Sequence, residues 1–362
     1  MMFNKKNTKI LIIGNGFDLA HDLPTSYLDF IHFVEFFMAC ISQANPTNYI
    51  SEYAEKQVGL LAKDYLLELF SSDKKDFIKH EFEMLLSENV WYSYFLASKI
   101  KTGNTWIDFE SEISSVIQSL YSLALDFTNE EIWIKNDKIL VPYIFNERPK
   151  QIDDFFRMRD TLIIDLKKFT RALELYLADF VNMIPLTNKI PEIDGIKFDK
   201  VICFNYTNTY ERLYKGKEIT EIEYVHGKAS LKSTIETCNL VLGIDEFLSD
   251  LEENVDTDFI EFKKFYQRIY KKTGCSYMKW LRDIEQQKID AHIFIFGHSL
   301  DITDKDILYP FLNLEKAKTD IYYHSKKSFG NQIKKLVKLL GEANLIESVY
   351  KSKIEFLPQG GC

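Results

Sequence analysis

Polar residues capable of chemistry follow several short apolar runs in this sequence, beginning with Gly14-Asn15-Gly16 after Ile10–Ile13. Glycine lets the backbone approach a ligand closely, and the start of a helix offers N–H groups without partners, so this turn is a candidate phosphate site. The carboxylate of Asp18 stands two residues further on. The turn lacks the third glycine of the dinucleotide pattern G-x-G-x-x-G, so a bare tight turn with Asp18 capping the next helix remains the alternative.

A second candidate, Asn205, follows the apolar run Lys200–Phe204. Side chains at the carboxyl ends of strands in an open α/β sheet face the ligand crevice, so Asn205 could hydrogen-bond a ligand or hold a water molecule there. The alternative is that these residues have only a local structural role. Asn205 favours a turn, and Thr207 favours the start of a helix that we expect near Thr209.

The third candidate is His226, which stands between the apolar run Ile222–Val225 and Gly227. Imidazole changes its charge near neutral pH, so His226 could serve as a general acid or base. A hydrogen-bonded structural role is the alternative. His292 stands at the start of another apolar run and is interpreted as structural, and no pair of histidines has the spacing of metal ligands.

The fourth candidate segment is Gly297-His298-Ser299, directly after Ile293–Phe296. It repeats the arrangement of a buried strand that ends in glycine and small polar residues, and it resembles a phosphate or ribose contact. If the four segments lie on the same edge of one sheet, they surround a single crevice. We expect that crevice to be the functional site.

Acidic residues crowd the segment after Ser299. Thr303 and Asp306 have the spacing of a capping box, and Asp301 and Asp304 favour the first turn of a helix, so these residues could be purely structural. The alternative is that Asp301, Asp304 and Asp306 form the carboxylate cluster of a metal-dependent nuclease. The formal net charge of -9 argues against nucleic acid as a partner.

The elements that must position these residues indicate an α/β fold with a doubly wound, Rossmann-like parallel sheet, because short, fully buried runs alternate with helical patterns in the C-terminal half. The predicted strands are Ile10–Ile13, Lys200–Phe204, Ile222–Val225, Leu240–Gly243, Ile293–Phe296 and Asp320–Tyr323, and a helix is predicted over Asn331–Leu340. From about Ser26 to Ile184 the periodicity is helical. We therefore predict an α/β nucleotide-binding core formed by 1–26 and 195–362, with a mainly helical insertion over 27–194.

The composition limits the class of protein. With 362 residues and 46% apolar side chains the chain can bury a large core, and no apolar run approaches the roughly 20 residues of a membrane span. The apolar run after the basic N-terminus is too short for a signal peptide. Five cysteines are scattered without a C-x-x-C pair, which disfavours a zinc ribbon or a redox motif. We expect a cytoplasmic protein with no membrane partner and no bound metal.

Longer motifs give the sequence a family resemblance. The segments GNGFDLAHDLPTSYLDF from Gly14 and IFGHSLDITDKDIL from Ile295 resemble the two signatures of the AbiH-like family of bacteriophage abortive-infection proteins. The stretch Trp106–Glu110 and the segments FNYTNTYE, VHG and LVLGID also fit this family. The resemblance spans nearly the whole chain and implies an antiphage role.

The same segments more distantly resemble the sirtuin-like NAD-binding fold, in which a strand-end Gly-x-Gly, an Asn-Tyr-Asp-like segment, a His-Gly and a Gly-x-Ser segment recur in this order. Thr207 stands where many relatives carry Asp, and the chain has no zinc-binding cysteine quartet, so a lysine deacylase is not expected. The resemblance implies catalytic positions at Asn205 and His226. The residues that we expect to contact NAD are Gly14, Asn15, Gly16, Phe17, Gly297, His298, Ser299 and Asp304.

These inferences lead to the hypothesis of an abortive-infection effector that binds NAD and hydrolyses its nicotinamide N-glycosidic bond. Asn205 would position water or a ribose hydroxyl, His226 would act as the general base, and Asp18 would polarise the ribose or stabilise its positive charge. The expected partners are NAD or a related nucleotide, a phage-derived or host trigger protein, and further copies of the chain in a homo-oligomer. A nucleotide sensor without catalysis is the first alternative, and the metal-dependent nuclease is the second.

Overall fold

The computed structural model describes residues 7–43, 45–102, 108–126, 128–140, 144, 148–216, 220–244 and 257–360. Contacts between Cα atoms divide the chain into two compact units. The sheet unit comprises Met1–Leu23, Pro185–Lys228 and Lys272–Cys362, and the helical unit comprises Pro24–Ile184 and Ala229–Lys271. The helical unit thus takes in 229–271, which the sequence-based division places in the α/β core, and the functional division into domains stays a prediction.

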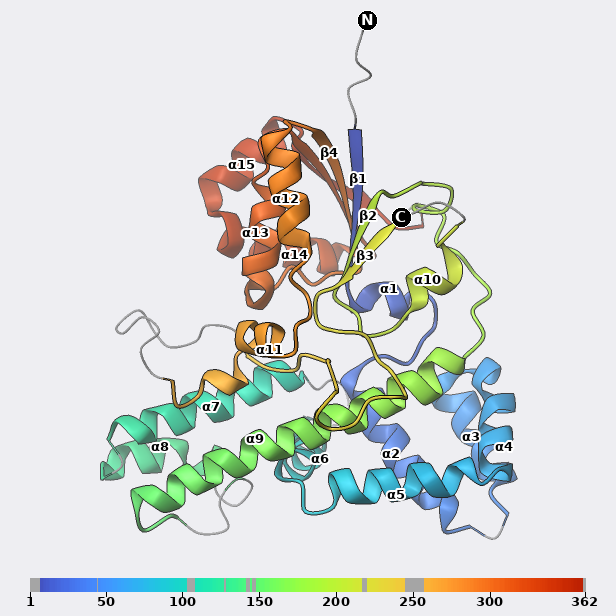
Figure 1. Cartoon of the computed structure of the whole chain (residues 1–362), viewed down its shortest axis with the longest axis vertical. Coiled ribbons are helices and arrows are strands. Elements are labelled where there is room, and N and C mark those ends of the chain that lie inside the picture. Colours follow the sequence, from blue (N-terminus) through green and yellow to red (C-terminus); the bar gives the residue numbers. More distant parts are fainter. Residues whose placement is uncertain are drawn as a thin grey trace, which may run out of the picture. The chain divides into compact units, whose positions relative to one another are not determined.

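Among the described residues, the sheet unit is built on six strands, each parallel to its neighbours. The strands are β1 (Asn7–Ile13), β2 (Lys200–Cys203), β3 (Glu221–Tyr224), β4 (Asp290–Phe296), β5 (Ala317–Tyr323) and β6 (Ile354–Pro358). Their order is β3-β2-β1-β4-β5-β6, so β1 lies inside the sheet, and the winding reverses between β1 and β4 (Figure 1). This order confirms the predicted parallel α/β sheet and is consistent with a Rossmann-like fold.

Successive side chains of β1 point to opposite faces of the sheet, as they must in a strand. Ile10 and Ile12 belong to one hydrophobic cluster, and Leu11 and Ile13 belong to another. All four side chains are at most 1% exposed. Because both faces are covered, the sequence of this strand is continuously apolar rather than alternating.

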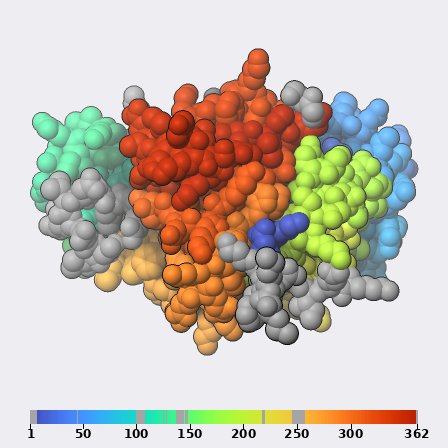
Figure 2. Space-filling model, turned by 90° about the horizontal axis from the view of Figure 1, so that it is seen from above, coloured from blue at the N-terminus to red at the C-terminus, as the bar shows by residue number. Residues whose placement is uncertain are grey.

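Helices cover both faces of the sheet. Those of the sheet unit are α1 (Asn15–Leu19), α10 (Thr209–Leu213), α12 (Tyr277–Gln286), η6 (Ile302–Asp304), α13 (Lys305–Leu312), α14 (Lys326–Leu340) and α15 (Glu342–Tyr350). The helices α12 to α15 contribute to the cluster that contains Ile10, whereas α1 and α10 contribute Phe17 and Tyr210 to the cluster that contains Leu11 (Figure 1). In the space-filling view, the start of β1 lies between the yellow-green segment around residue 200 and the orange segments that follow residue 270, as an inner strand should (Figure 2).

One predicted strand does not join the sheet. Leu240–Gly243 lies in the helical unit and forms no strand, and the adjacent Ile244 makes an isolated bridge with Lys263. A side chain satisfies the backbone of this segment instead. The Gln267 amide accepts from the N–H of Leu242 at 3.1 Å and donates to its carbonyl at 2.9 Å. Conversely, the edge strand β6 has no counterpart among the predicted strands.

The helical unit confirms the helical periodicity of its sequence. Its helices are α2 (Tyr27–Ile41), α3 (Thr47–Tyr53), η1 (Ala54–Val58), η2 (Leu60–Ala62), α4 (Lys63–Ser71), α5 (Lys74–Leu86), α6 (Val90–Thr102), α7 (Phe109–Leu125), α8 (Glu130–Leu140), α9 (Ile152–Leu175), η3 (Tyr176–Phe180), η4 (Val181–Met183), η5 (Ile260–Phe262) and α11 (Lys264–Tyr270). Aromatic stacking joins them: ring centroids are 4.5 Å apart for Phe33 and Phe180 and 4.1 Å apart for Phe95 and Phe109. In the part of the chain that the structure describes, no helix combines the length and the hydropathy that a membrane span requires.

A buried ion pair on α9 binds the loop that contains Ser230 and Ser233 through hydrogen bonds. Arg171 and Glu174, with side chains 3% and 0% exposed, approach to 2.5 Å. Arg171 also donates to the carbonyl of Ser230 at 3.0 Å, and Glu174 accepts from the N–H of Ser230 at 3.1 Å and from the hydroxyl of Ser233 at 2.9 Å. Buried charges are tolerated when they are paired and hydrogen-bonded, so this network is what holds the loop in place.

The stretch from Trp106 to Glu110 is described only in part, because Trp106 lies outside the described residues. Asp108 caps α7 by accepting hydrogen bonds from the N–H groups of Glu110 and Ser111 at 3.1 and 3.2 Å. Glu110 forms a 2.8 Å ion pair with Lys264, which is 1% exposed. Both acidic residues therefore have structural roles within the helical unit.

Candidate functional site

The first glycine turn packs directly against the turn that follows β4. The N–H of Gly16 donates to the carbonyl of Gly297 at 2.8 Å. A Cβ on Gly14 would lie 2.8 Å from the Cα of His298, and a Cβ on Gly16 would lie 2.8 Å from the Cα of Gly297. Both glycines are therefore required for the close approach of two strand ends at the point where the winding reverses, which is where open α/β sheets bind ligands.

The N–H groups of Gly14, Gly16 and Phe17 in this turn are already engaged. Gly14 donates to the carbonyl of Phe296 at 3.3 Å, and Phe17 donates to the carbonyl of Gly14 at 2.8 Å, in addition to the bond made by Gly16. A phosphate at this turn would therefore need donors other than these backbone groups. The side chain of Asn15 is exposed beside them.

The turn after β4 has an unusual backbone. Gly297 has a φ of +66°, and Leu300 has a φ of +57°, a region that side chains other than glycine rarely enter. The N–H of Leu300 donates to Nδ1 of His298 at 2.9 Å. Because Nδ1 accepts this bond, the proton of the neutral imidazole resides on Nε2. The turn thus fixes both the tautomer and the direction of the His298 ring.

A buried carboxylate lies between two imidazoles. Oδ1 of Asp304 is 3.4 Å from Nε2 of His226, and its Oδ2 is 3.5 Å from Nε2 of His298. All three residues are at most 6% exposed. Phe204 packs edge-on against both rings, with centroid distances of 5.3 Å to His226 and 4.2 Å to His298. Segments that follow β2, β3 and β4 thus form one cluster, in which the Asp304 carboxylate faces two imidazoles.

Asp18 lies buried in α1, directly after β1, at the same edge of the sheet. It is 1% exposed, and its Oδ2 accepts a 2.5 Å hydrogen bond from the hydroxyl of Thr207, which in turn accepts from Thr209 at 3.2 Å. Burial raises the pKa of Asp18 to about 6, against the lowering effect of Thr207, Thr209 and Asn205. Among the described residues, Oδ1 of Asp18 and Nδ2 of Asn205 are buried and have no partner in good hydrogen-bonding geometry, although the Asn205 side chain lies near enough to Asp18 to lower its pKa. Such groups call for a bound water or a ligand.

All four predicted segments contribute to this edge of the sheet. A Cβ on Gly14 would lie 3.0 Å from Cδ2 of His298, and Asp304 connects His298 to His226. Asn205 follows the strand between those that lead to Gly14 and His226. The structure therefore brings the segments together, and the roles of their residues toward a ligand stay predictions.

Two local interpretations of the sequence are wrong. Asp18 does not cap α1, because the N-cap position is Gly14 and no side-chain cap is formed there. Thr303 and Asp306 form no capping box. Asp301 caps η6 instead, by accepting a 3.4 Å hydrogen bond from the N–H of Thr303.

Two of the expected NAD contacts differ sharply in exposure. Phe17 is fully buried in the core of the sheet unit, with its ring edge-on to Phe296 at a centroid distance of 6.1 Å. Its side chain therefore packs the core and is unavailable to a ligand. Ser299 is exposed at the tip of the turn after β4.

The three carboxylates of the nuclease alternative do not converge. Asp301 forms a 2.9 Å ion pair with Lys335, Asp304 faces the two imidazoles, and Asp306 is exposed. In the part of the chain that the structure describes, no group of three histidine, cysteine, aspartate or glutamate side chains is placed to hold a metal ion. This geometry gives no support to a carboxylate-bound metal.

Two charged residues of α10 that lie near the site, Arg212 and Glu211, are not among the sequence-based candidates. Arg212 on α10 lowers the pKa of Asp18, and Glu211 forms a 2.5 Å ion pair with Lys228, just beyond His226. A signal for both was present, because α10 begins shortly after Asn205 and its first turns must therefore lie near the same strand end.

The fold and the site define an α/β protein with a doubly wound parallel sheet, whose buried titratable groups gather at the carboxyl ends of β1, β3 and β4. The chain belongs to the bacteriophage abortive infection AbiH family, whose family model matches residues 10–324. The match includes every candidate site residue and implies a role in abortive infection. No curated protein and no solved structure matches the chain significantly. A sirtuin-like NAD-binding core stays a prediction.

Proposed function

We propose that this AbiH-family protein binds NAD at the carboxyl edge of its sheet and hydrolyses the bond between nicotinamide and ribose. The observation that supports the proposal most is the pair of buried polar atoms, Oδ1 of Asp18 and Nδ2 of Asn205, that have no partner in good hydrogen-bonding geometry among the described residues. A ribose hydroxyl both donates and accepts hydrogen bonds, so it is chemically suited to satisfy the two atoms. The reversal of winding beside them supports the same placement of a nucleotide.

In the proposed reaction, water attacks the anomeric carbon of the ribose while nicotinamide leaves as a neutral base, and the products are ADP-ribose, nicotinamide and a proton. Asn205 orients the water or a ribose hydroxyl, and His226 accepts the proton of the water. The carboxylate of Asp18 stabilises the positive charge that develops on the ribose. Asp304 acts as a positioning residue, because it lies 3.4 Å from Nε2 of His226.

The phosphates are proposed to lie over the two packed turns. The N–H groups of Gly14 and Gly16 are engaged with backbone carbonyls, so their contribution is the absence of side chains. The exposed side chains of Asn15 and Ser299 flank the place where Gly297 meets the first turn, and they supply an amide and a hydroxyl as donors.

The proposed chemistry accords with the role of the family. Loss of NAD from the cytoplasm would stop the metabolism on which phage replication depends. Because constant hydrolysis would harm the host, we propose that a phage-derived or host protein triggers the activity. A homo-oligomer and a sensing role for the helical unit belong to the same proposal.

The test is incubation of the purified full chain with NAD, with and without lysate of phage-infected cells, followed by chromatographic measurement of nicotinamide. We expect His226→Ala and Asn205→Ala to lower the rate roughly 10²–10⁴-fold, which is the usual effect of losing a general base or its positioning partner. His80→Ala is the matched control, because His80 is exposed on α5 in the helical unit. Unchanged NAD consumption in both site variants would overturn the proposal.

A second outcome of this test would distinguish a nucleotide sensor from an NAD-hydrolysing enzyme. Saturable NAD binding that is lost in Asn205→Ala, without release of nicotinamide in any lysate, would replace hydrolysis by nucleotide sensing at the same site. Absence of both binding and turnover would remove NAD from the proposal altogether.

A further inference from the structure

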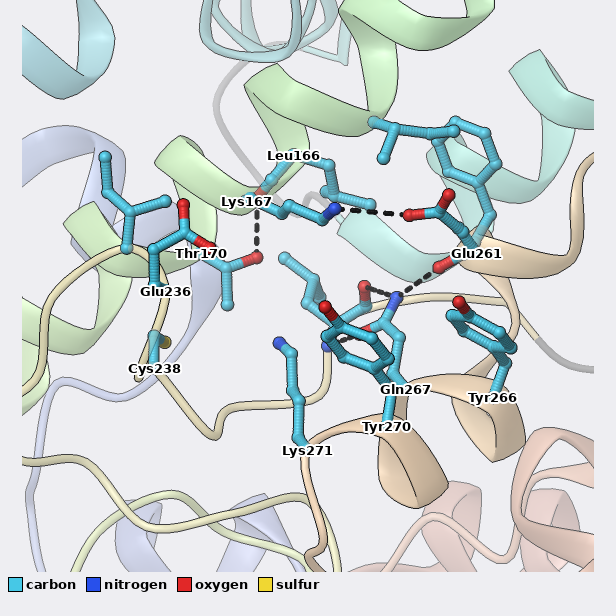
Figure 3. A pocket seen from close by; sticks show the side chains of 14 residues that line it. Leu166, Lys167, Thr170, Glu236, Cys238, Glu261, Tyr266, Gln267, Tyr270 and Lys271 are labelled. Atoms are coloured by element: carbon cyan, nitrogen blue, oxygen red, sulfur yellow. Dashed lines mark hydrogen bonds and ion pairs between the residues drawn. The ribbon is translucent and has the colours of Figure 1, made fainter.

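The helical unit contains a pocket of its own (Figure 3). The walls come from α9, from the segment 235–242 and from η5 with α11, all of which belong to the helical unit. The space between these walls, with the open solvent at its mouth included, amounts to about 690 Å³. None of its lining residues belongs to the sheet unit, so the pocket is independent of the candidate site described above.

One wall is a stripe along α9. Ile163, Leu166, Lys167 and Thr170 have the spacing of one helix face, and all four line the pocket. The hydroxyl of Thr170 donates to the carbonyl of Leu166 at 2.7 Å, and Lys167 pairs with Glu261 across the pocket at 3.2 Å. The polar groups of this wall are thus already engaged, and what remains for a ligand is largely apolar surface.

The facing wall is aromatic. The rings of Tyr266 and Tyr270 are stacked, with centroids 5.9 Å apart and planes 12° apart. The Gln267 amide, which lies between them in sequence, is held by Leu242 and by the carbonyl of Glu261 at 3.2 Å, so it is fixed and occupied. This wall therefore offers two flat rings, each with a phenolic hydroxyl, to a ligand.

Lys271 contributes a half-buried cation to the pocket. Its ammonium extends into the space between Cys238 on one side and Gln267 and Tyr270 on the other (Figure 3). It donates to the carbonyl of Leu240, and among the described residues this is its one hydrogen bond. Two of its three N–H donors therefore remain for a ligand or for solvent.

No group described near Lys271 forms an ion pair with its ammonium. Burial lowers its pKa, which shows that the charged form is poorly solvated. Glu174 is already paired with Arg171, and burial raises the pKa of Cys238 to about 12, so that thiol stays neutral. An anion beside Lys271 would restore the interactions that the ammonium has lost.

We propose that this pocket binds a small molecule with an aromatic or other apolar body and one anionic group, a carboxylate, sulfonate or phosphate, that is hydrogen-bonded to Lys271. The apolar body would lie between the α9 stripe and the two stacked tyrosine rings, and the anionic group would reach the ammonium. The proposal does not rest on the chemistry proposed for the sheet unit.

The test uses a pair of probes that differ in one group. 8-Anilinonaphthalene-1-sulfonate carries two aromatic groups and a sulfonate, and N-phenyl-1-naphthylamine is its neutral analogue. Fluorescence titration of the full chain should show saturable binding of both. We expect Lys271→Met to weaken the sulfonate probe roughly 10-fold or more and to change the neutral probe by less than about twofold, because the sulfonate alone loses a charge-assisted hydrogen bond, whereas the lost bond to Leu240 affects both probes alike.

Two further variants keep the result interpretable. Lys56→Met removes the same charge from a side chain that is 64% exposed, and it should leave both probes unchanged. Ile163→Trp fills the pocket and should abolish binding of both, while thermal unfolding reports whether each variant is folded. Equal affinity of the sulfonate probe for the native chain and Lys271→Met, or unaltered binding in Ile163→Trp, would refute the proposal.

Discussion

Thr207 donates a 2.5 Å hydrogen bond to Asp18, so two side chains 189 residues apart in the sequence join the ends of β1 and β2. Burial of this pair raises the pKa of Asp18 from 3.8 to about 6. Between these two values the folded state binds more protons than the unfolded state. The contribution of Asp18 to stability is therefore greatest below about pH 4, falls as the pH rises to about 6, and is constant above that.

Asp18→Asn should remove this dependence on pH. The amide oxygen still accepts from Thr207, but nothing ionises, so we expect the variant to be more stable than the native chain by up to about 3 kcal/mol at pH 7.5 and equal to it near pH 3.5. Urea unfolding over this pH range measures the difference. Asp76→Asn, at a side chain that is 68% exposed, is the control and should show no such trend. A variant with the native pH profile would mean that Asp18 titrates normally.

Gly297→Ala should separate the two turns that meet at the edge of the sheet. Its φ of +66° disfavours any side chain, and a Cβ would lie 2.1 Å from the backbone nitrogen of Phe17. We expect a loss of at least about 2 kcal/mol in the free energy of unfolding. Gly330→Ala is the matched control. Gly330 lies within α14, and a Cβ there would meet no neighbouring atom within 4 Å, so the change should stabilise the protein by about 0.5–1 kcal/mol.

His298→Ala should cost stability even if His298 never touches a ligand. The substitution leaves the buried N–H of Leu300 without its acceptor, and we expect a loss of about 1–3 kcal/mol in denaturant unfolding. His298→Asn places an oxygen near the position of Nδ1 and should recover most of that loss. If the two variants are equally unstable, the hydrogen bond to Leu300 is not what holds the turn.

The buried pair on α9 predicts strong coupling. Arg171→Met leaves Glu174 charged and buried, and we expect a loss of about 3–5 kcal/mol. Glu174→Gln likewise leaves the Arg171 guanidinium charged and buried without its carboxylate partner, and we expect a similar loss. The double variant should lose clearly less than the two single losses added together, as a double-mutant cycle of unfolding free energies would measure. Additive losses would show that the two side chains act independently.

The sequence predicts the strands that are buried on both faces, because such strands are continuous apolar runs. This holds for β1, β2 and β4, whereas β5 contains Lys318 and Asp320, and the edge strand β6 contains Glu355 and ends in Pro358. The run Leu240–Gly243 has the same composition as a true strand. It lies elsewhere because Gln267 bonds to its backbone and because Gly243 approaches the carbonyl of Phe262, where a Cβ would come within 2.3 Å. Such contacts between distant residues leave no local pattern.

The place of the candidate site was predictable, because parallel strands bring their carboxyl ends to one edge. The burial of its residues could not be predicted from the sequence. Asp18 follows a glycine turn and has the pattern of a capping residue, but the neighbouring helices bury it to 1% exposure. The position of Asp304 between His226 and His298 likewise depends on how η6 packs, which spacing in the sequence does not encode.

The inner position of β1 has a consequence for how the protein is made. Leu11 pairs with Phe294, so its partner strand emerges from the ribosome about 280 residues later, which takes roughly 15–60 s at bacterial and eukaryotic rates of synthesis. For most of that interval, until β2 is also made, an apolar strand has neither of its hydrogen-bonding neighbours, a condition that invites aggregation. We therefore expect nascent chains to require chaperone protection of this strand, and the defence protein to become competent only after synthesis is almost finished.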